Sequence, residues 1–227
     1  MPEHREPSQP PPRPRLRRPV WTLAAGAAAI VVVAIVAARR PPRWYGERSV
    51  AGEAAVADRE ARRLVTTVAG LQAAARQPGA WGAAVSEREI NSWLATDLPR
   101  NHAGALPAGW SEPRVRLEPG RILVAAWTSV GPLAAPLTCE IDVRLRAVNQ
   151  LECAVAAARI GAIPLPTGPF VHRLTALLDR LGFVTEPRRL DGRPVVVVSL
   201  GGRGAALEGL SVASGELVVA GTTEQPR

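Results

Sequence analysis

The 227-residue chain contains no lysine and few cysteines, histidines or aromatic residues. All 28 basic residues are arginine, and aromatic residues make up 4% of the chain. Two cysteines and three histidines, none at metal-ligand spacing, do not form the cluster that a zinc centre requires. The sequence also has no G-x-S-x-G nucleophile elbow and no P-loop lysine. We therefore expect no metal or cofactor, and we predict that the protein is not an enzyme.

Two weaker catalytic signals remain. His172 and Asp179 are seven residues apart on one side of an expected helix, so a dyad for a hydrolase can be drawn. A solvated histidine is the favoured interpretation. The glycine-rich run "GGRG" at 201–204 lacks the lysine or the fingerprint of a phosphate-binding loop and is interpreted as a connection between strands.

The positive charge is concentrated at the N-terminal end. The chain carries a net charge of +8, and residues 1–48 hold 9 of the 28 arginines but only 3 of the 20 acidic residues. The excess there is +6, which leaves +2 for residues 49–227. A nucleic-acid-binding domain needs a basic face on the folded part itself. The distribution therefore argues against nucleic acid and favours lipid headgroups as the partner.

Residues 20–38, "VWTLAAGAAAIVVVAIVAA", are 19 residues without a charge. As a helix they extend roughly 28 Å, close to the thickness of one hydrocarbon core. Trp21 at one end and Trp44–Tyr45 beyond the other are interpreted as interfacial aromatics. The sequence predicts a disordered Pro/Arg-rich tail over 1–19, a single transmembrane helix over 20–38, a stalk over 39–50 and an extracytoplasmic domain over 51–227.

The orientation rests on the layout of the chain, because arginines flank the span on both sides. A short tail followed by a long domain is typical of a signal-anchor with the N-terminus in the cytoplasm. The alternative is a cleaved signal, since Val36-Ala37-Ala38 resembles a cleavage site, but the apolar run is longer than such signals usually have.

Three helices are expected after the span. Residues 51–76 repeat apolar side chains at spacings of three and four, which favours packing on the same domain, with a homodimeric coiled coil as the alternative. Ser86 and Glu89 form a capping box, which predicts a helix over 86–96. A third helix follows residue 166, with a leucine-rich stripe. Residues 97–113 are predicted to be a Pro/Gly loop.

From Arg114 onward the period changes to two, which predicts antiparallel strands with one face buried. Residues 136–147 and 150–160 are interpreted as a hairpin with Leu145 opposite Leu151. This register puts Cys139 opposite a position near Ala157, too far from Cys153 for a disulfide. The predicted fold class is α+β: a curved antiparallel sheet packed with two or three helices.

The stretch "SEREINSWL", followed by "VRLEPGRILVAA" and the closing "GELVVAGTT", resembles a loose group of anchored bacterial extracytoplasmic proteins. These are the YpmS-like, YceB-like and LmeA-like proteins, and the likeness covers about residues 85 to 220. The motif positions present here are Ser86, Glu89, Ile90, Asn91, Trp93 and Leu94. The resemblance implies a tubular lipid-binding fold.

The implied function is to bind or transfer a lipid or another amphipathic molecule at the cell membrane, without catalysis. The candidate ligand-binding residues are Ile90, Asn91, Trp93 and Leu94, and an apolar cavity is expected on the inner side of the sheet. The competing interpretation of the motif is structural, with Asn91 bonded to a loop and Trp93 in the core. The alternative function is an anchored protein-interaction module in cell-envelope assembly, which uses a sheet edge or the 51–76 helix to bind an envelope protein.

Overall fold

The computed structural model describes residues 33, 36–46, 54–106, 109–130, 133–180, 182–190, 192–200 and 204–225. The chain divides into two compact units, Met1–Val36 and Ala37–Arg227. Of the first unit the structure describes Val33 and Val36, both helical. The predicted tail, most of the predicted span and the end of the predicted stalk lie outside the described residues. Within the described residues, no helix is both long and apolar enough to cross a membrane.

The three predicted helices of the second unit lie close to their expected positions, and two short helices, α2 and η2, were not predicted. They are α2 (Arg43–Gly46), α3 (Ala54–Ala74), α4 (Glu87–Asn101), the 3-10 helix η2 (Ala103–Ala105) and α5 (Gly168–Arg180). The predicted capping box of α4 is confirmed. The Glu89 N–H donates to Ser86 Oγ at 3.2 Å, and the Ser86 N–H donates to Glu89 Oε2 at 2.7 Å. The predicted loop over 97–113 is wrong at both ends, because α4 continues through Pro99 and a strand already begins at Trp110.

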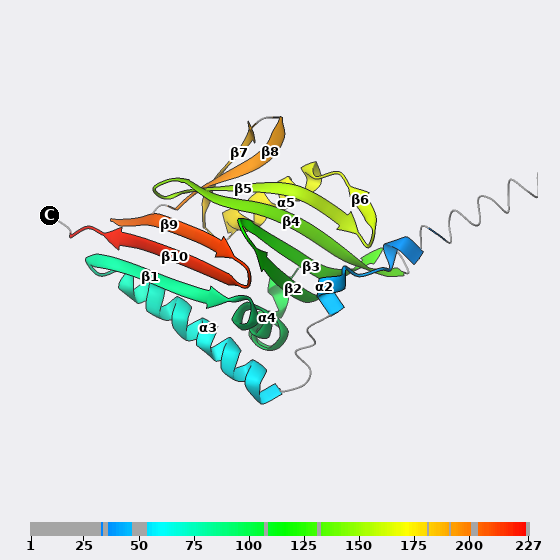
Figure 1. Cartoon of the computed structure of the whole chain (residues 1–227), viewed down its shortest axis with the longest axis horizontal. Helices are drawn as coiled ribbons and strands as arrows, with labels where there is room; N and C mark the ends of the chain where they lie inside the picture. Colours follow the sequence, from blue (N-terminus) through cyan, green and yellow to red (C-terminus); the bar gives the residue numbers. More distant parts are fainter. Residues whose placement is uncertain are drawn as a thin grey trace, which may run out of the picture. The chain divides into compact units, whose positions relative to one another are not determined.

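The larger sheet has seven strands, all paired antiparallel, in the order β2-β3-β4-β5-β8-β7, with β6 paired to β5 (Figure 1). These strands are β2 (Trp110–Glu118), β3 (Arg121–Val130), β4 (Leu133–Ala147), β5 (Gln150–Ile160), β6 (Ile163–Leu165), β7 (Val184–Leu190) and β8 (Arg193–Ser199). The expected antiparallel α+β class is therefore confirmed. Strand β7, "VTEPRRL", was not predicted, because it is polar and contains a proline, as edge strands do.

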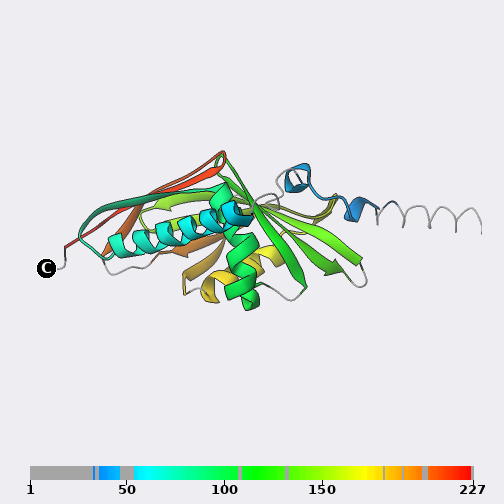
Figure 2. The same ribbon diagram turned by 90° about the horizontal axis from the view of Figure 1, so that it is seen from below.

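A second sheet contains β1 (Gly79–Ser86), β10 (Glu216–Thr223) and β9 (Ala205–Ala213), with β10 in the middle. The expectation of one sheet is thus corrected to two. Strand β1, "GAWGAAVS", was missed because its small residues carry no alternation of apolar and polar side chains. Figure 2 shows α3 lying along this sheet, so the apolar side of α3 packs within its own domain as expected.

The two sheets are joined at the turn between β4 and β5. Asn149 occupies this turn with φ of 60°, and its side-chain amide binds the backbone of β9. Its Nδ2 donates to the Ala205 carbonyl at 3.1 Å, and its Oδ1 accepts from the Leu207 N–H at 2.6 Å. A side-chain amide has a donor and an acceptor, so it can form the two hydrogen bonds to a strand that the backbone of a neighbouring strand would otherwise form.

The inner face of β5, β7 and β8 in the larger sheet is covered by α5. The core there comprises Val155, Val171, Val196 and Val198, with Phe170, Leu174, Leu178 and the two cysteines packed against it. The expected apolar cavity does not lie at this place, because the stripe on α5 occupies the inner side of β5 and β8. The leucine-rich stripe and the buried strand around Val195–Val198 were both predicted correctly from the sequence. The sequence could not show that the stripe of α5 packs on this strand.

Both cysteines lie in this core as free thiols. Leu145 pairs with Leu151 as predicted, and Cys139 lies near Ala157 as expected, opposite Ala158, because the register shifts between Glu140 and Ile141. Burial, and to a smaller degree the neighbouring Glu140, raises the pKa of Cys139 to about 11. Burial, then the neighbouring Glu152, raises the pKa of Cys153 to about 11 as well. The thiols are therefore protonated at neutral pH.

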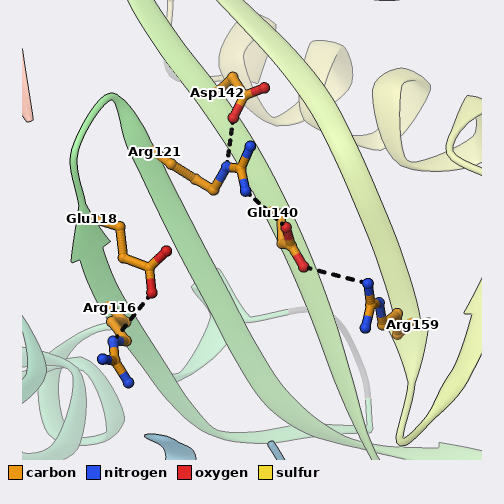
Figure 3. Close-up of polar contacts among 6 residues, drawn as sticks. All are labelled: Arg116, Glu118, Arg121, Glu140, Asp142 and Arg159. Atoms are coloured by element: carbon orange, nitrogen blue, oxygen red, sulfur yellow. Dashed lines mark hydrogen bonds and ion pairs between the residues drawn. The ribbon is translucent and has the colours of Figure 1, made fainter.

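The opposite face of the sheet carries a row of ion pairs (Figure 3). Arg121 contacts Asp142 at 2.6 Å and Glu140 at 3.2 Å, and Glu140 also faces Arg159 at 3.9 Å. The row crosses strands β3 to β5 and has partners of both signs. This arrangement is typical of a solvated sheet face rather than of a binding surface for one charged ligand.

The cysteines provide a test of this core. At pH 8, a thiol whose pKa rises from 9.0 to about 11 has its thiolate fraction lowered about 100-fold. We expect iodoacetamide to alkylate the folded protein about 100-fold more slowly than the urea-unfolded protein, measured by mass spectrometry. Equal rates in the two states would contradict the buried position of both thiols.

Two glycines test the close packing inside the smaller sheet and the open position of Gly70 on α3. A Cβ at Gly221 would lie 2.1 Å from the Ala206 carbonyl oxygen and 2.4 Å from the Trp81 ring, so Gly221→Ala is expected to destabilise the protein by about 1–3 kcal/mol. A Cβ at Gly70 in α3 meets nothing within 4 Å, so Gly70→Ala is expected to stabilise it by about 0.5–1 kcal/mol. Urea unfolding followed by tryptophan fluorescence measures both, and effects of the same sign would contradict the crowding at Gly221 or the open space at Gly70.

Candidate functional site

A groove with a volume of about 610 Å³ lies between α3, α4 and the start of β2, and we call it the α4 groove. Its lining consists mostly of small or apolar side chains: Ala54, Ala57, Leu94, Ala95, Pro99, Leu106, Trp110 and Pro113, with Asn91, Thr96, Ser111, Glu112 and Arg114 as the polar members. The volume lies within the range of about 300–1,000 Å³ that is usual for small-molecule sites.

Alanines bring α3 and α4 together along one wall of the groove. Ala57 and Ala61 are each 4% exposed, because α3 packs on α4 at these positions. Ion pairs connect the same two helices, Arg100 with Asp58 at 3.1 Å and Arg63 with Glu89 at 3.0 Å. Such partly exposed pairs contribute little stability but fix which faces meet. The first two turns of α3 and the middle of α4 are thereby held at a defined spacing.

Asn91 attaches α4 to the edge of the large sheet. Its Nδ2 donates to the Val115 carbonyl at 2.7 Å, and its Oδ1 accepts from the Val115 N–H at 2.8 Å. Both halves of the amide are thus engaged with β2, which is the outer strand of its sheet. The structural interpretation of Asn91 is confirmed, with the difference that its partner is a strand rather than a loop.

Other groups complete the cover of the β2 edge. Glu87 Oε2 accepts from the Leu117 N–H at 2.9 Å, and the Leu117 carbonyl accepts from the Gly215 N–H at 3.0 Å. Pro113 has no N–H, and the Glu112 carbonyl accepts from the Tyr45 hydroxyl at 2.6 Å. An exposed strand edge is a template for unwanted pairing, and these contacts close it.

The opposite wall of the groove is a bulge in β2. The register between β2 and β3 shifts between Ser111 and Arg114, and Glu112 has φ of 50°, an uncommon conformation for a residue with a side chain. Tyr45 stabilises this wall, since its hydroxyl holds the Glu112 carbonyl and its own carbonyl accepts from Arg114 at 3.2 Å. The bulge turns these residues away from the regular strand and toward the groove.

The four predicted ligand-binding residues separate into two pairs. Asn91 and Leu94 line the α4 groove. Ile90 is half-buried and Trp93 packs its ring 5.8 Å from that of His102, and neither contributes to the groove lining. The capping and clamping roles of Ser86, Glu89 and Asn91 show that the motif first of all positions α4.

The groove residues outside the motif were missed by sequence reasoning. Ala54 and Ala57 belong to the predicted apolar seam of α3, but the sequence does not show that α4 lies against it. Pro113 within a strand was the available signal for the bulge. Tyr45 had been interpreted as an interfacial aromatic, and this is wrong: it is 5% exposed, inside the domain.

The remaining polar groups of the groove are largely engaged with the protein itself. Thr96 donates to the Ser92 carbonyl at 2.8 Å, and the Arg114 guanidinium lies 5.2 Å above the Tyr45 ring. Outside the groove, His172 is exposed and Asp179 accepts a hydrogen bond from Thr185. Residues 201–203 of the glycine-rich run lie outside the described residues.

Comparisons with protein families, with characterised proteins and with solved structures give no match to this chain.

The Asn91 clamp predicts a specific loss of stability. Asn91→Ala leaves the Val115 N–H and carbonyl without their partners, so we expect the free energy of unfolding to fall by about 2 kcal/mol. The matched control is Asn101→Ala at the exposed end of the same helix, where only Asp97 is lost as a partner, with an expected change within about 0.5 kcal/mol. Urea titrations of both variants provide the comparison. Similar losses in the two variants would show that Asn91 is not a clamp.

Proposed function

We propose that this protein binds or transfers a lipid or similar amphipathic ligand, and that the apolar part of the ligand occupies the α4 groove. The observation that carries the proposal is the combination of a volume of about 610 Å³ with a lining dominated by apolar side chains. Transfer of a hydrocarbon chain from water to such a surface is favourable by roughly 25 cal/mol per Å² buried. The motif helix α4 supplies part of this lining, which agrees with the resemblance drawn from the sequence.

The state of the polar groups favours binding over catalysis. Asn91 and Thr96 are bonded to backbone atoms, and a general acid or base requires a group that is available to the ligand. Both thiols lie in the core under α5 with raised pKa values, which makes them weak nucleophiles. The proposed role is therefore non-catalytic.

The proposed location is the outer side of a cell membrane, with residues 20–38 as a single-pass anchor. The support is the uncharged 19-residue run and the arginine excess around it. A lipid-binding groove on a domain tethered to the bilayer has its ligand within reach at all times.

A protein-interaction module is the second candidate function. Val65 and Val68 on α3 are 49% and 40% exposed, although Val68 lies on the same side of the helix as the buried Ala57 and Ala61. A partner in the cell envelope that covers these side chains would be lost in the double variant Val65→Glu, Val68→Glu, whereas ligand uptake by the α4 groove would be retained.

Filling the groove tests the proposed function. In Ala95→Trp a large ring replaces a methyl group in the lining, and cross-linking of a photoreactive palmitic acid to α4 is expected to fall about ten-fold or more. The control is Ala69→Trp, which places the same ring at an exposed position of α3 outside the groove.

The full-length protein in detergent is illuminated with the probe, and labelled peptides are identified by mass spectrometry. Equal labelling of α4 in the two tryptophan variants, or no labelling of the unaltered protein, would refute the proposal.

A further inference from the structure

The segment Ala37–Gly46 is attached to the domain at two places. At the first, the Ala162 N–H donates to the Ala37 carbonyl at 2.9 Å, in the turn between β5 and β6. The approach is close: a Cβ at Gly161 would lie 2.3 Å from the carbonyl oxygens of both Ala37 and Ala38. Only glycine leaves room for the chain there, and its φ of 56° favours glycine as well.

The second attachment is Tyr45. Besides its hydrogen bond to Glu112, its ring meets the Trp127 ring edge-on at a centroid distance of 6.5 Å and lies under the Arg114 guanidinium. Burial raises the pKa of Tyr45 to about 12, with the charge of Glu112 as the next cause, so the hydroxyl keeps its proton. Glu112 and Arg114 line the α4 groove, so this attachment point is also part of the groove wall.

The attachments limit the distance between the groove and the end of the predicted span. Six residues lie between Ala38 and Tyr45, and the seven Cα-to-Cα steps that join them reach at most roughly 25 Å in a fully extended chain. Arg39, Arg40 and Arg43 on this segment are exposed. Their charge is complementary to anionic lipid headgroups.

We propose that residues 37–45 form a latch that holds the α4 groove at the bilayer surface, so that the groove receives its ligand from the bilayer rather than from water. This inference rests on the proposed function. A tether that keeps two sites together raises the effective concentration of one at the other, often into the millimolar range. The predicted stalk would then act as a fixed connection. A flexible linker, in contrast, would leave the groove free to move away from the bilayer.

The test compares two routes of loading in the full-length protein. In the first, the protein is reconstituted in vesicles of phosphatidylcholine and phosphatidylglycerol that contain a photoreactive phospholipid. In the second, the protein is in detergent and a photoreactive palmitic acid is added from the aqueous phase. In both, the yield of cross-links on α4 is measured by mass spectrometry.

Gly161→Ala is the informative variant, because its Cβ displaces Ala37 and Ala38 without contacting the groove. Its control is Gly192→Ala, which has a similar positive φ of 76° but meets nothing within 4 Å. We expect Gly161→Ala to lower labelling from the bilayer about ten-fold while labelling from water stays unchanged. Gly192→Ala is expected to leave both unchanged.

Tyr45 provides a second variant pair, and because Tyr45 also supports the groove wall through Glu112, labelling from water shows whether the groove itself has changed. Tyr45→Phe keeps the ring against Trp127, whereas Tyr45→Ala removes it, so labelling from the bilayer is expected to fall further in Tyr45→Ala. Wild-type labelling of Gly161→Ala from the bilayer would overturn the latch. Labelling of the unaltered protein only from water would overturn the latch and leave the proposed function standing. The absence of labelling by either route would overturn both.

Discussion

The geometry of this domain depends on the pairing of Asn91 with the backbone of Val115. One side-chain amide satisfies both the N–H and the carbonyl of an outer strand, and in doing so fixes the rotation of α4 against β2. Since α3 packs on α4 and the bulge of β2 begins close by, both walls of the α4 groove are set by this contact. Asn149 repeats the same solution where β9 meets the turn between β4 and β5. Two asparagines thus bind the backbone of outer strands, β2 and β9, outside the pairing of these strands with β3 and β10.

The parts of the fold that were predictable from the sequence are those governed by short-range rules. The capping box at Ser86 and Glu89 fixed the start of α4, and the alternation over 137–146 gave the hairpin with Leu145 opposite Leu151. The end of α4 and the strands β1 and β7 were not predictable in this way. A helix that continues through Pro99, a strand of glycine and alanine, and a polar edge strand all owe their conformation to neighbours distant in the sequence.

The candidate site was predictable only in part, because its residues also depend on neighbours distant in the sequence. Asn91 and Leu94 were identified from a motif, and both line the groove, but Ile90 and Trp93 of the same motif point elsewhere. A motif on one helix does not reveal which helix packs beside it, so Ala54 and Ala57 stayed unassigned. A cavity is expected on the inner face of the sheet, but at β5 and β8 this face has the valines and leucines of a filled core. An alternating strand shows that one face is covered, and it cannot distinguish a covering helix from a bound ligand.

The central position of β10 has a consequence for how the domain assembles. Strand β1 pairs only with β10 in its sheet, and the Trp81 indole donates to Thr223 across 142 residues of sequence. Thr223 in turn donates to the Ala75 carbonyl just beyond α3. During synthesis β1 therefore has no sheet partner until almost the whole described chain has been made. A contact of such long range is costly in loop entropy, so the pairing of β1 with β10 is expected to be a late and slow step of folding. Until then, the apolar surfaces of β1 and α3 are not covered by this sheet.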